Sequence, residues 1–152
     1  MQSQDVIIEI LNDLIAIHYD RKKGYERAAD EAEDETLREQ FHLMAAESKQ
    51  ALSELQAEVT KLGGEAENKA STGGKLYRMW MNIYHTMTGR DRSTVLGTCE
   101  EGENVALVAY VEALKFRKFL PENLQQLLSN HHTQLVKARD TIAHLGEEVY
   151  SQ

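Results

Sequence analysis

The chain has 152 residues, of which 41% are hydrophobic and 28% charged, and its formal net charge is −8. This length fits one domain with a buried core, and the negative charge excludes a general nucleic-acid binder, which needs a basic face. One proline and 9 glycines are too few for a β-rich chain with many tight turns, so we expect helices.

The compartment is predicted from the cysteine content and the first residues. Cys99 is the only cysteine in the sequence, which excludes an internal disulfide and fits a reducing compartment. The N-terminus MQSQDVIIEI lacks the basic segment of a secretory signal. No apolar run approaches the roughly 20 residues that span a bilayer. We therefore expect a cytoplasmic protein that binds neither membrane nor nucleic acid.

Two helices are predicted in the first part of the chain. Residues 4–33 carry an apolar stripe with a spacing of three and four, and His18 lies on this stripe. The capping box Thr36–Glu39 is predicted to open a second helix, which ends at Gly63-Gly64. Its predicted core positions are Leu37, Phe41, Met44, Ser48, Ala51, Leu55 and Leu62.

Residues 63–92 are predicted to form a crossover with a helix of its own. GGEAENKASTGGK (63–75) is a small-residue linker, and LYRMWMNIYHTMTG (76–89) is apolar on nearly every side. A helix that is apolar all round must bury more than one face. We therefore expect a homodimer formed through residues 76–88.

Two more helices complete the pattern. The third is predicted over about 93–118, and Leu120-Pro121-Glu122 forms the corner before the last helix. Four long helices in two hairpins, joined by a long crossover, predict an all-α, ferritin-like four-helix bundle. We expect residues 1–152 to form this bundle as a single domain.

The sequence also resembles a family of small bacterial ferritin-like proteins known as a domain of unknown function of type 2383. The likeness rests on GYERAAD (24–30), ELQAEVTKLGGE (54–65), LYRMW (76–80) and EEGENVALVAYVEAL (100–114). It implies a four-helix bundle, often paired as a dimer, and no established activity.

A complete di-iron site is not encoded in this sequence. Such sites use a Glu from each of two helices and a Glu-x-x-His from each of the other two. The chain has one Glu-x-x-His, Glu39 to His42, beside the first corner, and Ser129 and Leu128 stand where His132 and His131 would need a Glu. The sequence does not decide whether the protein is an enzyme, but the incomplete di-iron ligand set favours a protein without catalytic activity. We expect no cofactor.

Several polar residues nevertheless lie on the apolar stripes. With hairpin corners at opposite ends, a rise of about 1.5 Å per residue puts His18, Tyr110 and His131 at one level, about 25 Å from the first corner. Tyr25 and Glu103 share a level about 10 Å lower. We expect Glu103 to face Tyr25, and His18 to face Tyr110 and His131, as buried hydrogen bonds. If the corners shared one end, His18 would meet Glu103 instead.

The same residues allow a second interpretation. His18, Glu103 and His131, with Glu47 or Glu100, could form a reduced iron or zinc site. The sequence thus favours a non-enzymatic bundle protein that acts by self-association or by binding a protein partner that the sequence does not identify. The alternative is a metal-binding, stress-related protein.

Overall fold

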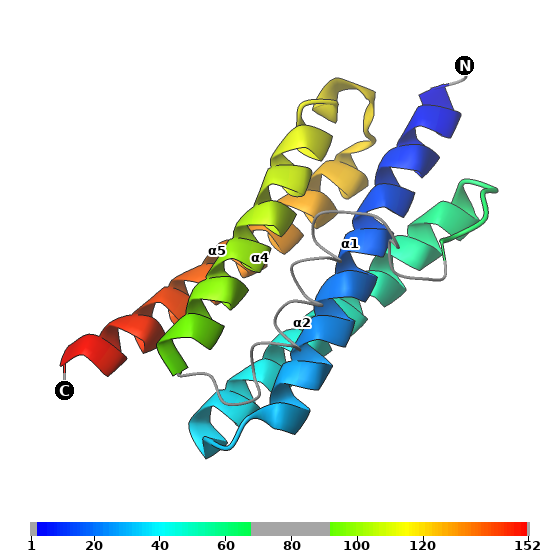
Figure 1. Cartoon of the computed structure of the whole chain (residues 1–152). Coiled ribbons are helices and arrows are strands. Elements are labelled where there is room, and N and C mark those ends of the chain that lie inside the picture. The colour runs from blue at the N-terminus through cyan, green and yellow to red at the C-terminus, as the bar shows by residue number, and fades with distance from the viewer. Residues whose placement is uncertain (1–2, 68–91, 152) are drawn as a thin grey trace.

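The computed structural model describes residues 3–67 and 92–151, and in this part of the chain it contains helices and no strands. The long helices are α1 (Ser3–Glu31), α2 (Glu35–Lys61), α4 (Arg92–Leu114) and α5 (Glu122–Ser151) (Figure 1). α1 packs on α2 and α4 packs on α5, so the all-α bundle of two helical hairpins is confirmed. Residues 68–91, which hold most of the crossover and its expected short helix, lie outside the described residues.

The two hairpin corners lie at opposite ends of the bundle (Figure 1). Side chains of α1 meet α4 in antiparallel order, because His18 contacts Tyr110 and Tyr25 contacts Glu103. α2 therefore ends near the second corner, where Asn123 lies beside Glu58, while α4 begins at the other end. This is the arrangement that a single crossover between the hairpins requires.

The ends of α2 show one correct prediction and one wrong prediction. Gly63 has a φ of +81°, and the amides of Gly63 and Gly64 donate to the carbonyls of Thr60 and Val59. This Schellman arrangement ends the helix where the two glycines predicted. The predicted capping box at Thr36–Glu39 is wrong, because Asp34 is the N-cap and accepts a hydrogen bond from the Leu37 amide at 3.2 Å.

The second corner begins earlier than predicted. α4 ends at Leu114 instead of near residue 118, and residues Arg117–Phe119 form one 3₁₀ turn, η1. The Phe119 amide donates to the Phe116 carbonyl at 2.9 Å, the shorter spacing of a 3₁₀ helix. α5 then starts directly after Pro121, whose carbonyl accepts from the Leu124 and Gln125 amides.

The core divides into two apolar clusters along the bundle axis. One lies toward the α1–α2 corner and includes Tyr25, Phe41, Leu96, Cys99 and Ile142. The other lies toward the α4–α5 corner and includes Leu11, Leu14, Leu55, Tyr110 and Leu128. Among the described residues, six polar or charged side chains are also buried: His18, Asp20, Arg21, Ser48, Glu103 and His131.

Candidate functional site: a buried polar network

Arg21 and Glu103 form the centre of the buried network. Arg21 Nε lies 2.7 Å from Glu103 Oε1, and the two side chains are 2% and 0% exposed. Burial by itself lowers the pKa of the guanidinium, but the Glu103 carboxylate overcomes this effect, and the pKa of Arg21 is raised. Arg21 therefore keeps its charge inside the bundle, and its salt bridge to Glu103 joins α1 to α4.

The remaining Arg21 donors connect this pair to α2. Nη1 donates to the Met44 carbonyl at 3.1 Å and to Ser48 Oγ at 2.8 Å. Nη2 lies 3.3 Å from Oε1 of Glu47, whose side chain is 36% exposed. One guanidinium thus binds groups from α2 and α4 and neutralises part of the charge of two carboxylates.

Glu103 also accepts a hydrogen bond from Tyr25. The Tyr25 hydroxyl donates to Oε1 at 2.7 Å, while Oε2 has no hydrogen-bond partner among the described residues. Burial and then the charge of Glu103 raise the pKa of Tyr25, and the same two causes raise the pKa of the buried Cys99 thiol. Both groups therefore stay protonated at neutral pH, and Cys99 is an inert thiol.

A second set of contacts surrounds the Tyr110 hydroxyl. This oxygen lies 2.6 Å from His18 Nε2 and 2.9 Å from His131 Nδ1. His18 Nδ1 lies 3.0 Å from Ser48 Oγ, and His131 Nε2 lies 3.0 Å from Oε1 of Glu54. The row begins at Glu54, which is 39% exposed, crosses α5, α4 and α1, and reaches Ser48 and hence Arg21.

The acceptor Glu54 at one end of this row and the donor Arg21 at the other fix the protons between them. The Glu54 carboxylate accepts, so His131 carries its proton on Nε2, and Tyr110 donates to the free Nδ1. The Tyr110 oxygen then accepts from His18 Nε2–H, and Ser48, which accepts from Arg21, donates to His18 Nδ1.

Both histidines are neutral in this arrangement. Burial lowers the pKa of His18 and of His131, and Arg21 lowers that of His18 further, while Glu54 opposes the shift at His131. Every hydrogen bond in the row can therefore form with both imidazoles uncharged.

The predicted buried pairs are confirmed. Glu103 faces Tyr25, and His18 faces Tyr110, whose hydroxyl also contacts His131. Arg21 was missed, although it lies three residues after His18 and four before Tyr25, on the same helix face. This spacing could have identified Arg21 as a member of the buried network.

The residues of the alternative metal site do not meet at one point. His18 and His131 lie close together, with ring centroids 5.7 Å apart, whereas Glu103 and Glu47 both contact Arg21. Glu100 lines a separate groove with Ile142 and Gly146. Within residues 3–67 and 92–151, no group of three or more His, Cys, Asp or Glu side chains could hold a metal ion.

The fold and this interior define a helical bundle whose two hairpins are joined by a buried polar network. Residues 6–116 match the model of a family described as Domain of unknown function (DUF2383), and the chain belongs to this family. This confirms the resemblance noted from the sequence.

A solved structure shares the fold. It is the crystal structure of a protein from Xanthomonas campestris pv. campestris, with a TM-score of 0.78 and 13% identity, covering 99% of this chain and 94% of that one. At this identity the likeness shows the fold alone. No curated protein matches the sequence, and no described helix is long and apolar enough to cross a membrane.

Proposed function

We propose that this protein acts without catalysing a reaction, by self-association through the outer face of α4. The observation that carries the proposal is the exposure of Val108 and Val111, which are 61% and 47% exposed although the opposite side of α4 is buried in the core. A helix that is apolar on more than one side is stabilised by burying both sides.

Charges on the same face are arranged for contact with a second copy. Glu101 and Val108 lie seven residues apart on one line of α4, and Lys115, the first residue after this helix, continues the line by the same spacing. All three are exposed, and Lys115 also forms a surface ion pair with Glu112 of its own chain at 2.8 Å. If two copies of α4 packed antiparallel about Val108, Glu101 of each would face Lys115 of the other. Such a two-fold contact is self-complementary in both shape and charge.

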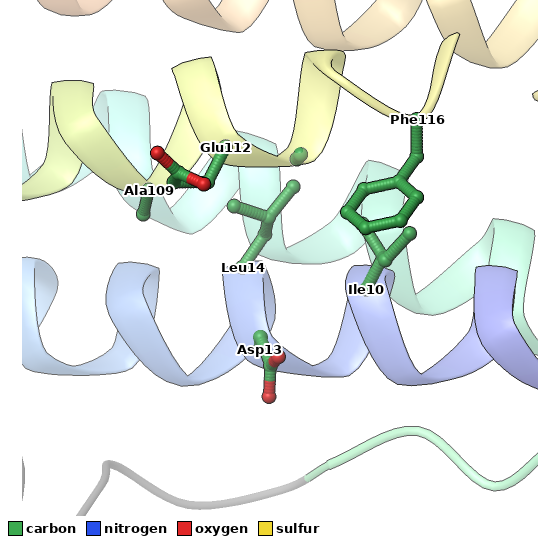
Figure 2. A pocket seen from close by; sticks show the side chains of 7 residues that line it. Ile10, Asp13, Leu14, Ala109, Glu112 and Phe116 are labelled. Atoms are coloured by element: carbon green, nitrogen blue, oxygen red, sulfur yellow. The ribbon is translucent and has the colours of Figure 1, made fainter. Parts of the chain in front are cut away.

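A groove beside this line extends the apolar surface. Figure 2 shows Leu14 pointing from α1 toward α4 and the Phe116 ring lying beside Ile10. Ala109 and Ala113 of α4 leave room between these larger side chains. The carboxylates of Asp13 and Glu112 also line the groove, whereas its other five lining residues are apolar. A side chain of a second copy could be buried there.

The experiment measures the mass of the protein in solution by light scattering over a range of concentrations. We expect a dimer for the wild type, and a monomer for Val108→Lys and for Lys115→Glu. Leu43→Lys is the matched control, since Leu43 is 60% exposed on α2, away from this face. The double reversal Glu101→Lys with Lys115→Glu should restore the dimer, because it restores the paired charges.

A wild type that is monomeric at every concentration would overturn the proposal. The sequence also predicted dimerisation through residues 76–88, of which the structure describes none. Replacing the apolar side chains of that segment by serine tests this second surface. If those changes alone produced a monomer, the interface would lie in the crossover and not on α4.

The metal-binding alternative has less support. The four ring nitrogens of His18 and His131 already take part in hydrogen bonds, and Glu103 is paired with Arg21. A ligand role would require these bonds to break.

A further inference from the structure

We infer that Tyr110 is a redox-active tyrosine, which gives up one electron to an oxygen-centred radical while its proton leaves through His131 to Glu54. This quenching consumes one Tyr110 electron per radical and is therefore stoichiometric rather than catalytic; it goes beyond the proposed self-association and depends on different residues.

The geometry around the Tyr110 oxygen carries the inference. The hydroxyl donates to His131 Nδ1 at 2.9 Å and accepts from His18 Nε2 at 2.6 Å. A phenol loses an electron far more easily when its proton can pass to a base at the same time. His131 is such a base because its Nδ1 carries no proton in this arrangement. Burial also raises the pKa of Tyr110, so the phenol is protonated before it is oxidised.

The proton has a route to solvent. When Tyr110 loses an electron, its proton moves to His131 Nδ1, and the proton on His131 Nε2 moves to Glu54 Oε1, 3.0 Å away. Glu54 is 39% exposed and exchanges that proton with water. The electron converts a peroxyl radical into a peroxide anion, which takes a proton from water to give the hydroperoxide. One electron and one proton therefore leave the protein for each radical quenched.

His18 stabilises the product. Its Nε2–H keeps a hydrogen bond to the oxygen of the neutral tyrosyl radical, and its position is fixed by Ser48 on the other ring nitrogen. The radical would be enclosed within the core, since Tyr110 is 0% exposed. Enclosure protects it from coupling with other molecules and should make it long-lived.

Tyr25 is also buried and bonded to a base, but it lacks these advantages. Its acceptor is Glu103, which is 0% exposed and paired with Arg21. A proton on Glu103 would neutralise the partner of a buried guanidinium. The hydrogen bonds that link Glu103 to the partly exposed Glu47 run through Arg21, which would have to give up a proton to relay it. Oxidation at Tyr25 is therefore less favourable than at Tyr110.

The test uses the full-length protein and a photogenerated ruthenium polypyridyl oxidant, with the tyrosyl radical followed by electron paramagnetic resonance and transient absorption. We expect a persistent radical in the wild type that is lost in Tyr110→Phe. Tyr19→Phe is the control, because the Tyr19 hydroxyl contacts the Gln56 amide and not a base. Glu54→Gln retains an acceptor oxygen on the surface but removes the base, so radical formation should slow severalfold.

An unchanged persistent signal in Tyr110→Phe would overturn the inference. If that variant failed to fold, Glu54→Gln would still test the proton route, since this side chain lies at the surface. Radical formation at the wild-type rate in Glu54→Gln would overturn the assignment of Glu54 as the proton exit. A purely structural network predicts no effect of Glu54→Gln on radical kinetics, so stability and redox roles are distinguished.

Discussion

Arg21 of α1 and Glu103 of α4 form an ion pair, with 2.7 Å between Nε and Oε1, and neither side chain is more than 2% exposed. The pair connects the two hairpins, which also meet through apolar contacts, through the Tyr25–Glu103 hydrogen bond and through the row of hydrogen bonds around Tyr110. Sliding α1 along α4 would separate these two charges while both remain buried, which is unfavourable. We therefore expect the pair to fix the register between the hairpins.

Glu103→Gln should destabilise the fold strongly. The change leaves the Arg21 charge buried without its closest counter-ion, and removing one partner of a buried pair costs about 3–5 kcal/mol. The free energy of unfolding, measured by urea denaturation, should fall by that amount. The double variant Arg21→Met with Glu103→Leu should recover most of the loss, because the only carboxylate that loses its partner, Glu47, is 36% exposed and no fully buried charge is left unpaired.

The matched control is Glu26→Gln, which breaks the Lys22–Glu26 pair. Those side chains are 31% and 49% exposed, so the expected change is below about 0.5 kcal/mol. If Glu103→Gln cost no more than this control, the buried pair would contribute nothing to stability.

Stability should decrease as the pH falls from about 7 toward 5. The pKa values of His18 and His131 are lowered in the folded state, so the unfolded chain binds their protons first, beginning near the ordinary histidine pKa of about 6.5. For each histidine, the free energy of unfolding falls by up to about 1.4 kcal/mol per unit decrease in pH in this range. Above about pH 7 both states are neutral at these groups and the effect vanishes.

The slope of unfolding free energy against pH is the quantity to compare between variants. Arg21 of α1, Glu54 of α2 and Tyr110 of α4 face the two histidines, and none of them is altered in the test. His131→Gln should reduce the slope by the contribution of one buried histidine, while His42→Gln, at an exposed position, should leave the slope unchanged. An equal slope in all three proteins would contradict the prediction.

Metal loading should leave no iron or zinc on the desalted protein. The ring nitrogens of His18 and His131 are engaged in hydrogen bonds with neighbouring side chains, and Oε1 of Glu103 is bonded to Arg21. Mass spectrometry on untagged protein, before and after anaerobic iron loading, measures the metal per chain. A metal that is retained by the wild type and lost from His131→Leu would instead support the metal-binding alternative.

Cys99 should react with alkylating reagents only when the bundle opens. The thiol is buried, and burial together with Glu103 raises its pKa, so little thiolate is present at neutral pH. We expect alkylation in native buffer to be at least about 100-fold slower than in urea. Comparable rates in the two conditions would show that this end of α4 is open to solvent.

The levels of the buried polar groups could be predicted from the sequence because a helix has a constant rise. Counting residues from two corners was enough to place Tyr25 beside Glu103 and His18 beside Tyr110. Arg21 could not be chosen by residue type, since arginine is rarely fully buried unless it is paired. Its position on the helix face did indicate burial, but only the location of Glu103 explains how burial is tolerated.

Helix ends were predicted less well, because neighbouring residues can each cap a helix and their capping free energies differ little. Asp34 and Thr36 are both good N-cap residues, and the backbone geometry of the corner selects Asp34. The exposed line on α4 was not predicted, because Val108 and Val111 lie in a segment, VALVAYV (105–111), that is apolar on several sides. Their exposure depends on how α4 is rotated against α1 and α5, which spacing alone does not determine.

Replacing glycine by alanine should have opposite effects at Gly63 and Gly97. Gly63 has a φ of +81°, which alanine adopts poorly, so Gly63→Ala should lower the free energy of unfolding by about 1 kcal/mol. Gly97 lies within α4, where the described neighbours leave room for an alanine methyl group, so Gly97→Ala should raise it by about 0.5–1 kcal/mol. Urea denaturation of both variants measures the two shifts. Shifts of the same sign would contradict either the left-handed conformation of Gly63 or the helical conformation of Gly97, because only the backbone distinguishes these two open positions.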